Sequence, residues 1–528
     1  MRPYLPVSLS ILFVLLTVSI ISLSPSASAD DPEPFEEGYF KYSIQTDYAV
    51  IFEYIGEEIE VVDVPDTVTY NGEDYEVKKI LCTFFDDYIE VVNIGRNIVS
   101  IIDSCFQAPN LEEINVAEDN GTFSSFDGVL FNKGMNTLIK YPEGRIDEIY
   151  EVPDAVSYIG PFSFEYSDYL TEVILNDGLV KIGRYAFSDC TALEHISSSD
   201  GADTFPSTLS MIGEFAFYRC GNLKSFALPD ELEVIGQSAF EYCGMEIVEL
   251  PYMLWSIGDR AFSNCTNLTK FDFTRGYSMH FEIHDGVLYS MTDPITLKSY
   301  PAGKDTEVFT VYDNTGNIDH SAFSGCKYLK EVILNDNIVI IDSGAFEGCH
   351  SLEKIDLTNV LSIGSCAFFE CKNLTDVTFG EYLYYIDSDA FNGTGIRSVT
   401  FGDNLKEIGV NVFSQCRNLT EVVISENCKM TLENYTFYGC LNMEKITVKG
   451  YDAVFDAGSL DIGYSEESLT TVDVYVRSGY SIPDDAVGEF TVLNVIEEGK
   501  KPYPYENLIV VFFCVLLIIG ILLFVREV

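Results

Sequence analysis

The amino-acid sequence predicts an elongated repeat solenoid built mainly of β-structure. Thirteen times along the chain a Phe follows an Ile or Leu by five residues, and the unit returns about every 22–23 residues in its regular stretches. An alternating apolar pattern follows most of these Phe residues. A fixed period of this length is typical of proteins whose units contact only their neighbours. Because one unit cannot bury its own apolar face, stacked units are expected to share one continuous core.

Each unit is predicted to form one coil with one short strand and 3₁₀ or turn segments. The strand is predicted from runs such as Leu329-x-x-Val332-x-Leu334, whose last two members alternate as one strand face requires. The Ala-Phe segment is expected to form the turn, and a second turn leads to the next Ile. The predicted Phe positions are Phe85, Phe106, Phe164, Phe187, Phe217, Phe240, Phe262, Phe323, Phe346, Phe368, Phe391, Phe413 and Phe437.

Cysteine recurs in nine of these units, three residues after the Phe. These residues are Cys190, Cys220, Cys243, Cys265, Cys326, Cys349, Cys371, Cys416 and Cys440. An exported chain with many cysteines often forms disulfides, but Ser167 and Thr394 fill the same position in other units, which favours a ladder of small buried thiols. Cys366 and Cys428 fall outside the ladder and are the better candidates for exposed or paired thiols.

The complete repeat resembles the BspA-like class of leucine-rich repeat. The resemblance is carried by segments such as IGEFAFYRCGNLKSFAL, from Ile212 to Leu228, and IGDRAFSNCTNLTKFDF, from Ile257 to Phe273, and it extends over roughly residues 40–448. Residues 42–80 are similar to the entry segment of that family. The resemblance implies a cell-surface protein of a host-associated microbe that acts in adhesion or protein binding.

The two ends of the chain carry export and membrane signals. Arg2, an apolar stretch and Ala27-Ser28-Ala29 form a predicted signal peptide, and the eighteen apolar residues at 508–525 reach about 27 Å, enough for a transmembrane helix. We therefore expect a single-pass type I membrane protein with an extracellular ectodomain. Removal of the tail for a lipid or wall linkage is the alternative, although no LPxTG-like motif precedes it. The predicted segments are a signal peptide (1–29), an entry segment (30–79), a solenoid (80–448), a β cap (449–496), a juxtamembrane linker (497–507), the helix (508–525) and a cytoplasmic tail (526–528).

Two longer coils, at about residues 117–158 and 274–317, interrupt the period. Both contain Asp-Gly-Val-Leu, starting at Asp127 and Asp285, and both then reach Tyr-Pro-x-Gly, starting at Tyr141 and Tyr300. The Asp-Gly pairs predict hairpins, and the shared order of motifs indicates a block copied once. The longer coils are either simple variants of the unit or projecting loops that shape a binding surface.

The composition argues against several classes of function. With 31 Lys and Arg against 83 Asp and Glu, the formal charge of −52 disfavours nucleic acid and anionic lipid as partners. The sequence contains no recognised catalytic or phosphate-binding motif, so we expect no enzyme activity and no cofactor. His280, Glu282 and His284 would share a strand face as a metal trio, but His284 corresponds to Phe126 in the first long coil, which favours packing.

The predicted binding residues are aromatic. Trp255 and Tyr384 share one repeat position, two residues before the Ile, and Tyr252, Tyr382 and Tyr385 lie nearby. Tyr and Trp often anchor recognition surfaces, although packing between coil edges explains them equally well. The strand residues expected to face solvent form a mixed polar face: Glu172, Lys270, Asp272, Glu331, Lys354, Asp356, Asp376, Thr378, Ser398, Thr400, Glu421, Lys445 and Thr447.

Seven Asn-x-Ser/Thr sequons are predicted glycosylation sites in a cell that performs N-glycosylation. They are Asn120, Asn264, Asn267, Asn373, Asn392, Asn418 and Asn434, although the repeat itself dictates part of this pattern. Together these features predict a membrane-anchored, adhesin-like protein that binds an extracellular protein or glycan. The alternative is a passive component of an acidic surface coat, and the sequence leaves the oligomeric state open.

Overall fold

The computed structural model describes residues 33–199, 201–463 and 470–498, which divide into two compact units. Unit 1 contains residues up to 135 together with 139–145, and unit 2 contains residues 136–138 and those from 146 onward. The predicted signal peptide, transmembrane helix, tail and most of the linker lie outside the described residues. Within the described residues, the structure contains no helix of sufficient length and apolar character to span a bilayer.

Unit 1 begins with a mostly antiparallel sheet whose strand order is β1-β2-β3-β6-β5, with β8 also paired to β6. A second, parallel sheet has the order β4-β7-β9, and β10 and β11 form an antiparallel hairpin. A core cluster that includes Phe40, Tyr42 and Phe84 fills the space between them. The strands are β1 (Phe35–Glu37), β2 (Phe40–Gln45), β3 (Tyr48–Tyr54), β4 (Val61–Asp63), β5 (Thr67–Tyr70), β6 (Glu73–Ile80), β7 (Val91–Ile94), β8 (Ser100–Ile101), β9 (Glu113–Val116), β10 (Phe123–Phe126) and β11 (Val129–Asn132).

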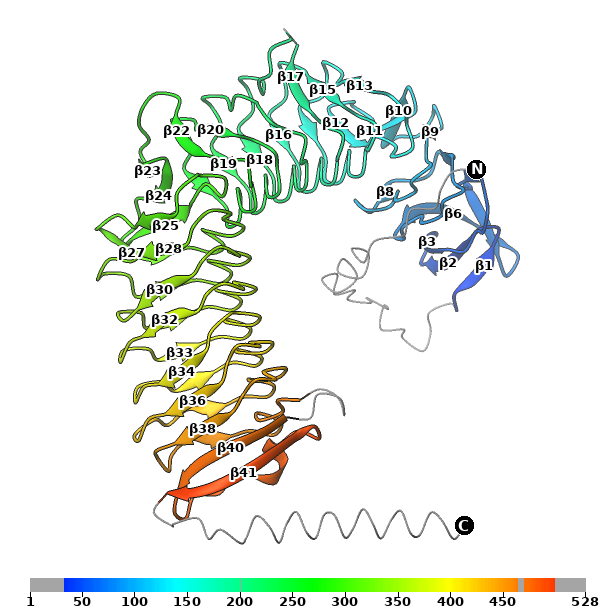
Figure 1. Cartoon of the computed structure of the whole chain (residues 1–528). Helices are drawn as coiled ribbons and strands as arrows, with labels where there is room; N and C mark the ends of the chain where they lie inside the picture. The colour runs from blue at the N-terminus through cyan, green and yellow to red at the C-terminus, as the bar shows by residue number, and fades with distance from the viewer. Residues whose placement is uncertain (1–32, 200, 464–469, 499–528) are drawn as a thin grey trace, which may run out of the picture. The chain divides into compact units, whose positions relative to one another are not determined.

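Unit 2 is a solenoid in which parallel strands of successive coils lie side by side (Figure 1). Most coils contribute a longer strand on one side and a short strand, usually of two residues near the unit Ile, on another side. The coil of Phe217 has only an isolated bridge, between Thr204 and Ala227, in place of its longer strand. The long strands are β13 (Ile149–Glu151), β15 (Glu172–Leu175), β17 (His195–Ser198), β20 (Ile247–Leu250), β22 (Lys270–Phe273), β26 (Val308–Thr310), β28 (Glu331–Ile333), β30 (Lys354–Leu357), β32 (Asp376–Phe379), β34 (Ser398–Phe401), β36 (Glu421–Ile424), β38 (Lys445–Val448), β40 (Thr470–Arg477) and β41 (Thr491–Glu498).

This second set of strands, which lies in two sheets, was missed by the sequence, which predicted one strand per coil. Two residues are too short to show an alternating pattern, yet their backbones pair in register with both neighbouring coils. Its strands are β12 (Thr137–Lys140), β14 (Tyr158–Ile159), β16 (Lys181–Ile182), β18 (Met211–Ile212), β19 (Val234–Ile235), β21 (Ser256–Ile257), β25 (Ile295–Ser299), β27 (Thr315–Ile318), β29 (Ile340–Ile341), β31 (Ser362–Ile363), β33 (Tyr385–Ile386), β35 (Glu407–Ile408), β37 (Thr431–Leu432) and β39 (Val454–Phe455).

The Ala-Phe segment is a turn rather than a helix. The Phe N–H donates to the carbonyl of the Ala in the next coil, as from Phe217 to Ala239 at 2.8 Å and from Phe346 to Ala367 at 2.7 Å. Because these bonds run between coils, the turn also ties neighbouring coils together. Among the described residues, the only helical element is the 3₁₀ turn η2 (Asp484–Ala486).

The Phe rings stack along the interior of unit 2. The centroids of Phe217, Phe240 and Phe262 are 5.3 and 5.7 Å apart, and their planes are within 3° of parallel. Rings from Phe323 to Phe413 continue the stack at 4.6–5.3 Å. All predicted ladder Phe and Cys residues in unit 2 are at most 3% exposed. The continuous core predicted from the period is therefore present.

The first predicted ring is wrong by one residue. Phe85 is 71% exposed, whereas Phe84 is fully buried and its backbone forms a parallel bridge with Phe106. The two Phe residues are consecutive, so only one can point inward. Phe84 takes that position because its ring also packs against Phe40 and Tyr54.

The two longer coils form the hairpins predicted from their Asp-Gly pairs. β10 pairs with β11, and β23 (Phe281–His284) pairs with β24 (Val287–Ser290). Both turn residues have positive φ in each hairpin, 50° and 73° at Asp127-Gly128 and 51° and 75° at Asp285-Gly286, as a type I′ turn requires. A cation from the following Tyr-Pro segment pairs with each turn aspartate: Arg145 with Asp127 at 3.2 Å and Lys304 with Asp285 at 3.1 Å.

The second long coil also continues the ring stack. Tyr300 is buried, its ring lies 5.0 Å from that of Phe323, and its N–H donates to the Ala322 carbonyl at 2.7 Å. This is the bond that Phe forms in regular coils. The Tyr-Pro-x-Gly motif therefore supplies the interior ring where the standard Ala-Phe segment is missing.

Candidate functional site

The turns that precede the two-residue strands, which we call the edge turns, carry exposed side chains whose types change from coil to coil. In one edge turn the Leu254 N–H donates to the Pro251 carbonyl at 3.3 Å. Tyr252 and Met253 occupy the centre of this turn and Trp255 follows it. Trp255 is 55% exposed and Met253 is also exposed, while Tyr252 is half-buried.

The preceding coil has an equivalent edge turn, in which the Leu232 N–H donates to the Pro229 carbonyl at 3.0 Å. Asp230, Glu231 and Glu233 there take the positions of Tyr252, Met253 and Trp255. Three acidic side chains are thus replaced by three large apolar ones between adjacent coils. Neither set is required by the fold, because both coils close in the same way.

The second long coil approaches this edge turn. The rings of Tyr252 and Tyr277 meet edge to face at 5.2 Å, and the Arg275 guanidinium lies 6.0 Å from the Tyr252 centroid. Arg275 also binds the Asp230 carboxylate at 2.7 Å, which lowers the pKa of Asp230. We call Tyr252, Met253, Trp255, Arg275 and Tyr277 the Trp255 patch. It joins a predicted binding edge to one of the two longer coils.

The other predicted aromatic residues form a separate group, the Tyr384 patch, made of Tyr382, Tyr384 and Tyr385. Tyr385 begins strand β33, Tyr382 and Tyr384 precede it, and Tyr384 is 54% exposed. Burial and, next, a hydrogen bond to Asp387 raise the pKa of Tyr385. Strands β25, β27, β29 and β31 lie between β33 and the coil of Trp255. The structure therefore does not bring the five predicted residues together.

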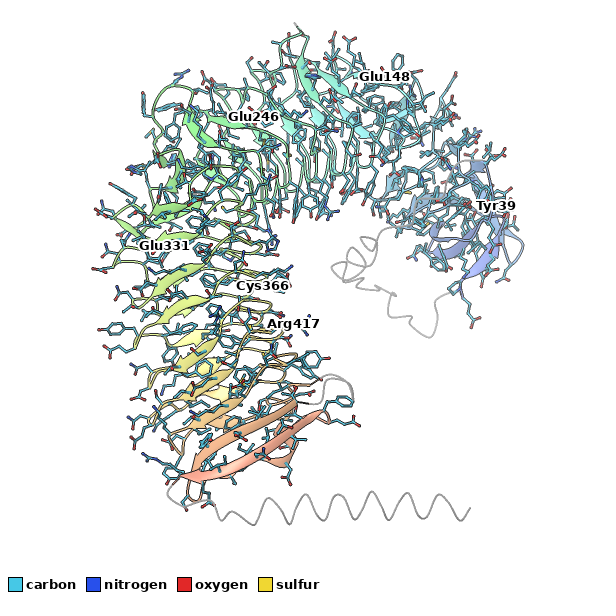
Figure 2. The ribbon with its side chains drawn as sticks, in the orientation of Figure 1. Tyr39, Glu148, Glu246, Glu331, Cys366 and Arg417 are labelled. Carbon is cyan, nitrogen blue, oxygen red and sulfur yellow. The ribbon has the colours of Figure 1, made fainter. Side chains whose placement is uncertain are left out.

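The long-strand face is polar, as expected, with one correction. Thr447 was predicted to face solvent but is only 8% exposed, and it lies opposite Tyr475 in the neighbouring strand β40. Ion pairs connect adjacent coils on this face, as between Lys354 and Glu331 at 2.8 Å. Figure 2 shows Glu331 on this side of the coils and Cys366 and Arg417 on the opposite side.

The predicted His280, Glu282 and His284 trio is not assembled. His284 Nε2 lies 2.8 Å from a Glu282 oxygen, and its ring stacks on Tyr312 at 3.9 Å. His280 is exposed. The packing role predicted for His284 fits this arrangement better than metal ligation.

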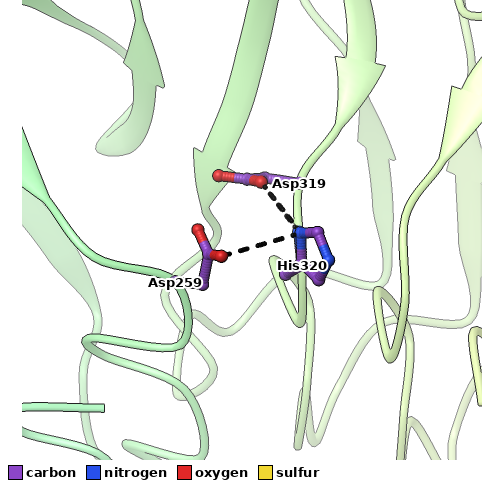
Figure 3. Close-up of side chains that lie close together, drawn as sticks. All are labelled: Asp259, Asp319 and His320. Atoms are coloured by element: carbon purple, nitrogen blue, oxygen red, sulfur yellow. Dashed lines mark hydrogen bonds and ion pairs between the residues drawn. The ribbon is translucent and has the colours of Figure 1, made fainter. Parts of the chain in front are cut away.

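A different cluster, which the sequence analysis missed, consists of Asp259, Asp319 and His320 (Figure 3). Lys298 binds both carboxylates, at 3.0 Å from Asp259 and 2.6 Å from Asp319. Although burial opposes its charge, the pKa of Lys298 is raised by the two carboxylates. An ammonium group thus takes the place that a metal ion would need, so this is an ion-pair network. No short motif signals it, because Lys298 comes from the inserted coil.

All of the ladder cysteines except Cys326 donate their thiol hydrogen to the carbonyl of the Phe in the preceding coil. The Sγ–O distances are 3.0 Å from Cys243 to Phe217 and 3.0 Å from Cys349 to Phe323. Burial raises the pKa of Cys265 to about 12, so the thiol keeps its proton. No disulfide joins cysteines within the described residues. Cys366 is partly exposed, as expected, but Cys428 is fully buried, contrary to expectation, and lies against the Leu405 carbonyl.

The sequons differ in access. Asn120 is fully buried, and its Nδ2 donates to the carbonyls of Gly95 and Ile98, so a glycan cannot reach it in the folded chain. Asn264, Asn392 and Asn434 are partly buried. Asn267, Asn373 and Asn418 are exposed, and their glycosylation stays a prediction.

Comparison with known proteins identifies the repeat. The sequence matches the BspA type leucine rich repeat region, in six copies, over residues 143–207, 202–296, 294–417 and 357–455. These ranges cover more than half of the chain. The chain belongs to the BspA-type leucine-rich repeat family. A search of curated proteins gives no match.

Solved structures include proteins similar to this BspA-type chain. A leucine-rich repeat protein from Eubacterium ventriosum is 21% identical, with a TM-score of 0.51 over 73% of this chain and 95% of that one. A leucine rich cell surface protein from Faecalibacterium prausnitzii is 20% identical, with a TM-score of 0.46 over 80% and 96%. The pneumococcal vaccine antigen PcpA is 18% identical, with a TM-score of 0.43 over 88% and 99%. At 21% identity the likeness to the Eubacterium ventriosum protein concerns the fold alone.

Proposed function

We propose that this chain is a membrane-anchored extracellular protein that binds a protein or glycan through the Trp255 patch. Its family and the cell-surface protein among its structural neighbours support a surface location, as do the predicted signal and membrane segments. The observation that carries the binding proposal is the change from Asp230, Glu231 and Glu233 to Tyr252, Met253 and Trp255 at equivalent positions. Large exposed aromatic side chains that the fold does not need are typical anchors of recognition surfaces.

The chain's chemistry supports binding rather than catalysis. Lys298 binds both carboxylates of the cluster of Asp259, Asp319 and His320, and the ladder thiols are buried. The Trp255 patch itself holds no nucleophile beside a general base. A passive role in an acidic coat is the second candidate, and it is favoured by the charge of −52 and the cross-coil ion pairs on the long-strand face.

Saturable binding of the full chain to arrays of extracellular proteins and glycans tests the proposal. We expect at least one ligand whose binding falls about 30-fold or more when Trp255→Ala removes the anchor, as for interface hot spots. Tyr384→Ala is the matched control, because Tyr384 occupies the same repeat position with nearly the same exposure. A coat protein would give no saturable ligand, or binding that depends only on net charge and is unchanged in both variants.

A further inference from the structure

The side chains of the Trp255 patch have the composition of a protein interface. Tyr, Trp, Met and Arg are enriched at the centres of such interfaces, and the patch contains all four residue types. Met253 is exposed beside Trp255, although a thioether gives a sugar little to bind and gives an apolar side chain an adaptable partner. The Tyr252–Tyr277 pair fixes two rings from different coils at 5.2 Å, which reduces the ordering cost on binding.

Carboxylates surround this apolar centre. Glu231 and Glu233 extend from the preceding edge turn, and Glu249 lies three residues before Tyr252; all three are exposed. None of them forms an ion pair within the described part of the chain. The one cation of the patch, Arg275, is already bound to Asp230 at 2.7 Å. The rim of the patch is therefore negative and not internally neutralised.

We propose that the Trp255 patch binds a basic protein segment, which places apolar side chains on Trp255 and Tyr252 and cationic side chains on Glu231 and Glu233. This inference rests on the proposed function and specifies its ligand class. Charge complementarity of this kind speeds association and selects the partner. A second copy of the chain is disfavoured, because two molecules of charge −52 repel each other.

Selection of random dodecapeptides on the full chain tests this proposal, with a glycan array run in parallel. We expect the enriched peptides to carry net positive charge and at least one large apolar residue. Their affinity, measured by fluorescence anisotropy of labelled peptide, should fall about 30-fold or more in Trp255→Ala and stay unchanged in Tyr384→Ala. Glu231→Gln with Glu233→Gln should weaken binding several-fold at low salt and flatten its salt dependence.

The unmodified protein provides a second readout. Trp255 is the only tryptophan in the chain, so a change in its emission on peptide binding reports this site alone. Enriched peptides that are neutral or acidic, or that bind the Trp255→Ala variant equally well, would overturn the inference. Trp255-dependent binding to glycans without peptide binding would overturn it too, yet leave the proposed function standing. If neither library binds saturably, both proposals fail.

Discussion

Three neighbouring coils of unit 2 place the same residue type in their interior but three different residue types at their edge. Inside, they present Phe217, Phe240 and Phe262, whose stacked rings are at most 3% exposed. At the residue following each edge turn the same coils present Ser210, Glu233 and Trp255. The interior residue is fixed by its two neighbours in the stack, whereas the edge residue contacts solvent. The repeat therefore separates residues that hold the coils together from residues free to acquire a ligand.

The largest effect should come from breaking the interior. Phe240→Ala should cost about 3–5 kcal/mol, because it removes a buried ring held between two others and leaves a cavity. Denaturant unfolding followed by circular dichroism measures this, with Tyr384→Ala as the exposed control. If Phe240→Ala lowers the free energy of unfolding as little as the control does, the ring stack does not stabilise the solenoid.

A buried ion pair in unit 1 extends the same comparison to charges. Lys140 and Glu143 are about 95% buried and 2.9 Å apart. Lys140→Met should cost about 3 kcal/mol, because it leaves the Glu143 carboxylate buried without this partner. Lys330→Met, which breaks an exposed pair with Glu307 at 2.7 Å, should lower the free energy of unfolding much less, because solvent screens this pair. Denaturant unfolding measures both changes. Equal falls in the free energy of unfolding would contradict the distinction between the buried and the exposed ion pair.

Thiol labelling compares interior and surface cysteines directly. Cys366 should react first with a thiol reagent, because it is the one partly exposed cysteine in the described residues. Cys243 and the other ladder thiols should react at least roughly 100-fold more slowly, since labelling requires local opening of the coil. Mass spectrometry of the labelled peptides gives the order. Fast labelling of Cys243 in the folded chain would show that the ladder is accessible.

The smallest expected effect is the pH dependence of stability that arises from His320 in the Lys298 network. A hydrogen bond to Asp319 raises the pKa of His320 in the folded chain. Its protonated form therefore stabilises the fold below its unfolded pKa of about 6.5, and this contribution is lost as the pH rises through the folded pKa. His320→Gln should lower the unfolding midpoint at pH 5.5 but not at pH 8.5. An equal change at both values would rule out a contribution from the charge.

The sequence predicted much of the fold because the period records which side chains face the interior. It misplaced the first ring, since Phe84 and Phe85 are consecutive, and it missed the two-residue strands, whose pairing leaves no local pattern. The predicted exposure of Thr447 and Cys428 was wrong, because the burial of both side chains depends on neighbouring coils. The burial of Asn120 could not be predicted, because a sequon carries no information on hydrogen bonds to the backbone of another coil. Tyr252 and Trp255 were identified, but Arg275 and Tyr277 were not, because only the path of the inserted coil places them beside Tyr252.

The central claim is that interior residues stabilise the coils and edge residues bind the ligand. It is tested most directly by measuring the stability and the binding of one edge variant, Trp255→Ala. Trp255→Ala should leave the free energy of unfolding within about 0.5 kcal/mol of the unmodified chain, as for ordinary surface substitutions, while it weakens binding of a selected basic dodecapeptide about 30-fold or more. A fall in stability comparable to that of Phe240→Ala would show that Trp255 packs the coil edge. Unchanged binding with unchanged stability would show that the edge carries no recognition.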